Sequence, residues 1–68
     1  MKAVEINNFV DGCPIEVSCN HHDTIGPLVT LIQNAGSVRF QHTMTPSQAR
    51  DMGVALLAMA DAIEEVAA

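Results

Sequence analysis

The feature that most constrains the fold is a helix start signal about two-thirds of the way along the chain. The tetrapeptide Thr45-Pro46-Ser47-Gln48 has a hydroxyl residue, then a proline, and a glutamine three residues after the hydroxyl, which is the order of a capping box. Pro46 loses nothing there, because the first amides of a helix have no internal partner. We expect the Thr45 hydroxyl to accept from the Gln48 amide while the Gln48 side chain reaches back. The signal predicts one long helix from Pro46 to about Val66.

Before this signal, apolar and polar residues alternate, which is the pattern of half-buried strands. The first such segment contains Val4 and Ile6, and the second runs from Ile15 to Cys19. A third segment, residues 28–32, has apolar residues on both faces, as expected for a strand covered on both sides. Alternation returns between Val38 and Met44. Turn signals separate these segments at Val10-Asp11-Gly12, between Asn20 and Pro27, and at Asn34-Ala35-Gly36.

The sequence therefore predicts an α+β fold of order β-β-β-β-α, in which one long C-terminal helix packs on one face of a four-stranded antiparallel sheet. The 68 residues form one domain, with residues 1–44 in the sheet and 45–68 in the capped helix. A chain this short is near the lower limit for a core that supports itself. Because one helix covers only one face of a sheet, the doubly apolar third strand favours a symmetric homodimer that covers the other face.

Two apolar surfaces are expected on the helix. At about 100° per residue, the main stripe consists of Met52, Leu56, Met59, Ile63 and Val66, and the opposite polar sector of Arg50, Asp51, Asp61, Glu64 and Glu65. Val54 and Leu57 lie inside that polar sector. They are either aliphatic residues exposed without consequence or, with the neighbouring Gly53, part of an interface. We predict a dimer interface at Gly53, Val54 and Leu57.

The charge balance limits the partners of the chain. Asp and Glu number 8 and Lys and Arg only 3, for a formal net charge of −5, so no basic stripe for a nucleic-acid backbone can form. Asp61, Glu64 and Glu65 lie near the end of the helix, where its macrodipole disfavours negative charge. They form either a solvated face or an acidic patch for a basic partner.

No catalytic motif and no strong metal motif is present, so we expect a non-enzymatic protein without a cofactor. A Cys/His nucleophilic pair would need a pocket and an orienting third group, for which a small domain has little room. Zinc sites usually contain a closely spaced ligand pair, and the chain has no Cys-x-x-Cys. A metal or small-ligand module at a dimer interface stays as the alternative. Its candidate ligands are Cys13, Cys19, His21, His22 and His42.

Targeting signals are also missing from the sequence. No signal-peptide pattern follows Met1-Lys2, and no apolar run reaches the roughly 18 residues of a membrane span. Two cysteines without a secretory signal are expected to stay as thiols in a reducing compartment. These features predict a cytoplasmic protein without a membrane segment.

The C-terminal third of the chain carries a resemblance. Residues 44–50 followed by 56–61 resemble the tail of small uncharacterised bacterial and phage proteins, in which a Thr-Pro-x-Gln-Ala-Arg segment enters an Ala/Leu-rich helix. In its short, acidic and motif-poor character the chain is similar to phage-encoded inhibitors of bacterial defence systems, anti-CRISPR proteins among them. The resemblance implies an inhibitor that binds a host protein in the host cytoplasm. Asp61, Glu64 and Glu65 would meet a basic surface that normally holds nucleic acid, with Val54 and Leu57 beside them.

Overall fold

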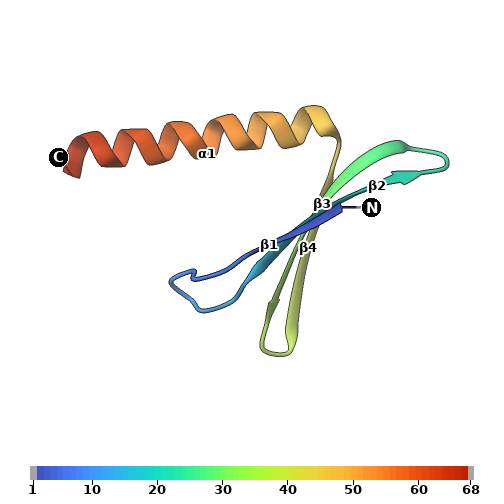
Figure 1. Ribbon diagram of the computed structural model, residues 1–68, viewed down its shortest axis with the longest axis horizontal. Coiled ribbons are helices and arrows are strands. Elements are labelled where there is room, and N and C mark those ends of the chain that lie inside the picture. Colours follow the sequence, from blue (N-terminus) through green and yellow to red (C-terminus); the bar gives the residue numbers. More distant parts are fainter. Residues whose placement is uncertain (1, 68) are drawn as a thin grey trace.

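The computed structural model describes residues 2–67, which form a four-stranded antiparallel sheet followed by one helix (Figure 1). The strands follow one another in the order β1-β2-β3-β4, so each pairs with the next along the chain. The predicted fold class is confirmed. The predicted domain also includes Met1 and Ala68, which lie outside the described residues. The elements are β1 (Lys2–Ile6), β2 (Ile15–His22), β3 (Gly26–Ala35), β4 (Val38–Met44) and α1 (Pro46–Ala67).

The three turns of the sheet occur at the turn signals. Between β1 and β2, the Gly12 amide donates to the Phe9 carbonyl at 2.9 Å, and Gly12 has a φ of +76°. Between β3 and β4, the strand continues to Ala35, so the loop consists of Gly36 and Ser37 rather than Asn34–Gly36. Gly36 has a φ of +64°, which is the left-handed conformation that glycine adopts without strain.

The capping box at the start of α1 forms as predicted. The Gln48 amide donates to Thr45 Oγ1 at 3.2 Å, and the Thr45 amide donates to Gln48 Oε1 at 3.0 Å. The Ala49 amide closes the first helical turn on the Thr45 carbonyl at 2.9 Å. Two backbone donors at the helix start are therefore satisfied by side chains, which locally fixes where the helix begins.

Strand register separates an apolar face of the sheet from a polar one. Val4 is paired with Val17, Val17 with Leu31, and Leu31 with His42, and directly paired residues point to the same side. We call this side the inner face; it also carries Ile6, Ile15, Val29, Gln33, Val38, Phe40 and Met44. The opposite side carries mainly polar residues, namely Glu5, Glu16, Ser18, Thr30, Arg39, Gln41 and Thr43, together with Leu28 and Ile32.

This arrangement differs from the expected one. The apolar pattern of the third strand predicted an open apolar face opposite the helix, but Leu28 and Ile32 lie among polar neighbours there. The extensive apolar side is the inner face, which is the side that α1 contacts.

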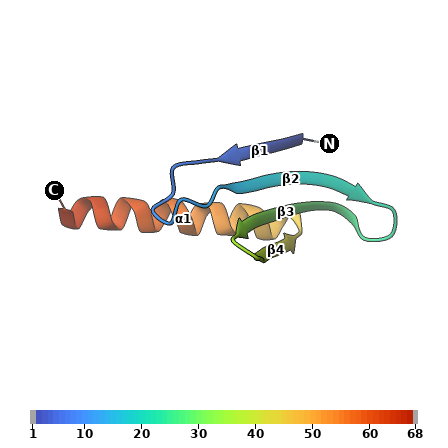
Figure 2. The same ribbon diagram turned by 90° about the horizontal axis from the view of Figure 1, so that it is seen from below.

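The helix contacts the sheet only near its own start. It follows β4 directly, touches β3 and β4, and then diverges from the inner face, so that sheet and helix form a V (Figure 1). Figure 2 shows α1 extending beyond the strands toward its C-terminal end. Met44 lies where the two arms meet and is 4% exposed, the one buried hydrophobic side chain among residues 3–66. Beyond Gly53, the side chains of α1 are exposed as far as Val66.

Candidate functional site

The space between the two arms of the V is an apolar hollow of about 350 Å³. Each of the first three strands contributes to it, through residues such as Ile6, Val17 and Leu31, and α1 contributes Met52 and Leu56 among others. Every residue that lines it is apolar or glycine. Such a surface is suited to apolar side chains and offers no group that would bind an ion.

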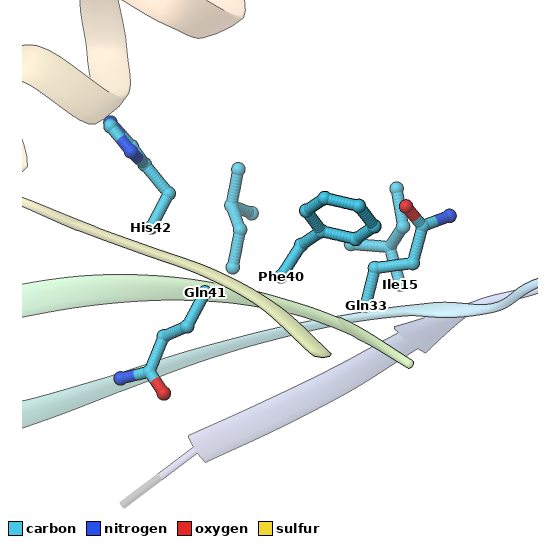
Figure 3. Close-up of a pocket in the computed structure, with 6 residues that line it drawn as sticks. Ile15, Gln33, Phe40, Gln41 and His42 are labelled. Atoms are coloured by element: carbon cyan, nitrogen blue, oxygen red, sulfur yellow. The ribbon is translucent and has the colours of Figure 1, made fainter. Parts of the chain in front are cut away.

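A second hollow of about 330 Å³ adjoins the first one on the same face, because Ile15 and Leu31 line both. Figure 3 shows Ile15, Gln33, Phe40 and His42 projecting from the sheet to one side, whereas Gln41 projects to the other. We call the two hollows together the inner groove. It is apolar between the arms of the V and has a polar edge at Gln33 and His42.

Gln33 also joins the inner groove to the loop before β2. Its Nε2 donates to Asp11 Oδ2 and to the Cys13 carbonyl, each at 3.3 Å, and Asp11 Oδ1 accepts from the Cys13 amide at 2.9 Å. These contacts give the loop a defined position beside the groove, so that Phe9 in that loop contributes to the lining.

Large apolar side chains remain exposed along both arms of the V. On the inner face of the sheet these are Val4, Ile6, Val38 and Phe40, and on the main stripe of α1 they are Leu56, Met59, Ile63 and Val66. Packing of the helix on one face of the sheet is thus limited to its first turns, and the rest of the main stripe is open.

Sequence reasoning missed this opening, although length gave a signal. A helix of 22 residues is about 33 Å long. The adjacent strand β4 has seven residues and spans only about 23 Å. The helix therefore extends past β4, the strand that it follows.

On the other side of α1, the predicted partner-binding residues lie together. Val54 and Leu57 are 67% and 68% exposed, and Asp61, Glu64 and Glu65 are exposed as well. Spacings of three or four residues make them neighbours on a helix surface. We call these five residues the outer surface. Gly53, predicted to join Val54 and Leu57 in an interface, instead lines the inner groove, so the structure divides that trio between two surfaces.

The predicted metal ligands are not brought together. Cys13 precedes β2, Cys19 lies within it, and His21 and His22 end it, whereas His42 lies on β4. Within residues 2–67, no group of three or more His, Cys, Asp or Glu side chains is placed to hold a metal ion. Cys13 and Cys19 are free thiols.

His22 has a structural contact instead. Its Nδ1 accepts from the amides of Thr24 and Ile25 at 3.1 and 3.2 Å, which stabilises the turn between β2 and β3. Because Nδ1 accepts these two amide hydrogens, only Nε2 of His22 is left for another ligand.

Comparison with known proteins gives no relative from which a function could be transferred. No protein family, no curated protein and no solved structure matches the chain. In the described part of the chain, no helix has both the length and the apolar character needed to cross a membrane. The inner groove and the outer surface are the two features of the structure that suggest a function.

Proposed function

We propose that this protein is a non-enzymatic inhibitor, of the type encoded by phages and mobile elements, that binds a host macromolecule through the outer surface of α1. The observation that carries the proposal is the exposure of Val54 and Leu57 directly beside three exposed carboxylates. A helix side that faces only solvent is mainly polar, and two adjacent aliphatic side chains within it favour a contact with another molecule.

The outer surface has the composition of a small protein-binding site. Its two aliphatic residues supply an apolar part, and Asp61, Glu64 and Glu65, which follow them along the helix, supply a charged part; protein interfaces combine these two kinds of contact. Three negative charges within five residues also create a local field that attracts a basic surface and speeds its approach. A partner that normally holds nucleic acid has such a surface, and the acidic rim would compete for it.

Capture and competition test the proposal. The tagged chain is used to capture proteins from a bacterial lysate at low and at high salt, and each captured protein is assayed for binding to fluorescent duplex DNA. We expect a DNA-binding partner whose capture weakens as salt rises, because salt screens exposed charges over about 10 Å at 0.1 M. The chain should also displace the DNA from that partner.

A charge-matched pair of variants identifies the surface responsible. The triple variant Asp61→Lys, Glu64→Lys, Glu65→Lys should lose both capture and competition while keeping its circular dichroism spectrum. The control Glu5→Lys, Glu16→Lys, Asp23→Lys changes the net charge equally, but on the sheet and its turn, and should behave as wild type. Equal behaviour of the two variants, or no DNA-binding partner at all, would overturn the proposal. Zinc or a small molecule retained in native mass spectrometry would favour the alternative of a ligand-binding module.

A further inference from the structure

The inner groove is too open for a chain that folds and remains alone. A compact monomer of 7.3 kDa exposes about 4,200 Å² of surface, whereas this chain exposes 5543 Å². Its radius of gyration is 14.2 Å, compared with about 11 Å for a compact domain of this length. The excess surface includes the apolar residues along the two arms of the V.

The size of this excess matches the surface that a dimer buries. An excess of roughly 1,400 Å² per chain is equivalent to roughly 2,800 Å² for two chains, within the range of about 2,000–5,000 Å² of obligate dimers. Transient complexes bury less surface, so the excess area fits an obligate protein partner better than a transient one.

The two open apolar surfaces of one chain are complementary in kind. The sheet arm presents an apolar face with Ile6, Ile15 and Phe40, and the helix arm presents an apolar stripe with Met59 and Ile63. Between residues 3 and 66, neither surface contains an Asp, Glu, Lys or Arg residue. Because the arms diverge, the main stripe of one chain does not reach the far part of its own sheet. In a dimer with a two-fold axis, the main stripe of the partner covers that part instead. Each copy then supplies the cover that the other lacks, which is the reciprocal contact of a two-fold interface.

The charges of the chain permit this approach. Asp61, Glu64 and Glu65 lie on the outer surface, away from Met59 and Ile63, so two acidic chains can meet without bringing these carboxylates together. The acidic residues of both copies would stay in solvent.

We infer that the inner groove binds a second copy of this chain, in a two-fold dimer in which the main stripe of each α1 packs on the inner face of the partner's sheet. This interface differs from the one predicted at Val54 and Leu57, which remains free on the outside of the dimer. The inference does not rest on the proposed function, whose residues lie on the outer surface.

Two residues of α1 give a matched test. Met59 and Leu57 are 66% and 68% exposed in the single chain, but only Met59 lies on the main stripe. In sedimentation equilibrium, the wild type should have twice the chain mass at micromolar concentration. Met59→Glu should raise the dissociation constant by more than about 100-fold, because it buries an unpaired charge. Leu57→Glu should leave the dimer intact. Dissociation by Leu57→Glu but not by Met59→Glu would place the interface on the outer surface and overturn the inference.

A second measurement on the wild type covers the case in which Met59→Glu fails to fold. Isotope-filtered nuclear Overhauser spectra of mixed labelled and unlabelled chains detect only contacts between copies. We expect contacts from the methyl groups of Met59 and Ile63 to the Phe40 ring or to Ile6 and Ile15. A wild-type monomer at micromolar concentration, or a dimer whose contacts lie only along the free edge of β4, would overturn the inference.

Discussion

The two halves of α1 differ in what holds them in place. The first half, from Pro46 to Leu56, begins with a reciprocal capping box and places Ala49, Met52 and Gly53 against the inner groove. The second half has the same apolar period, but its side chains are exposed in the single chain, and its last turns contain carboxylates and no basic residue. The same helical pattern thus has a tertiary contact in one half and none in the other.

This contrast shows where the stability of α1 originates. Isolated helices of this length are marginal in water, and most helical stability in proteins comes from packing of the apolar face. Burial of a large apolar side chain contributes about 1.5–3 kcal/mol. The capped half obtains part of such burial from the sheet, since Met52 is half-buried, whereas the second half obtains it only from another molecule. We therefore expect the second half of α1 to be ordered mainly in the dimer.

The largest expected effect comes from removing the anchor of the first half. Met44→Ala deletes most of the side chain at the meeting point of sheet and helix, which is 4% exposed. It should lower the free energy of unfolding by about 2–5 kcal/mol. Urea unfolding at one fixed protein concentration measures the effect, since dimerisation contributes to stability. Val54→Ala, at an exposed position of the outer surface, serves as the control and should change stability little. An equal loss in both variants would contradict the unequal anchoring of the helix.

A smaller loss is expected from the cap. Thr45→Ala removes the hydroxyl that accepts the Gln48 amide hydrogen and should cost about 1 kcal/mol. Hydrogen exchange of the α1 amides locates the effect, which should be largest in the first turn. Thr45→Ser keeps the hydroxyl and should retain most of the protection. Faster exchange confined to the end of the helix would show that the cap does not control its start.

The smallest effect should be a gain in stability at the C-terminal end of α1. Glu65→Lys replaces a negative charge in the last turns, where the macrodipole favours a positive one, and should stabilise the helix by about 0.3–1 kcal/mol. For a domain of this size, 1 kcal/mol corresponds to a rise in Tm of about 4–8 °C. Thermal unfolding followed by circular dichroism measures it. Asp23→Lys makes the same charge change in the turn between β2 and β3 and should leave the stability of the helix unaffected. Equal shifts in Tm for the two variants would show that the net charge, and not the helix dipole, causes the effect.

Local features of the fold were predictable because neighbouring residues determine them. Thr45 and Gln48 lie within one helical turn of each other, so their reciprocal hydrogen bonds form wherever the helix lies. The alternation around Val17 and Phe40 likewise indicates a strand before its partner is known. Helical spacing likewise predicts Val54 and Leu57 on the polar side of the helix, and the structure leaves both of them exposed there.

The candidate surfaces were predictable only in part. Helical spacing alone predicts the five residues of the outer surface. The inner groove could not be predicted in this way, because Met59 and Ile63 have the pattern of residues that pack on their own sheet. The same holds for Val38 and Phe40, which alternate like any half-buried strand. Periodicity tells which residues share a face, but not whether something covers that face.

The approximate positions of the strands and turns and the start of the helix could be derived from the sequence, since each depends on residues close together in the chain. Which apolar face stays open is a property of the tertiary contacts. That outcome depends on the angle at which α1 leaves β4, which is set by a few contacts around Met44 between residues distant in the sequence. A small change in that angle at the start of a helix of 22 residues moves its far end by many ångströms, so no local pattern encodes it.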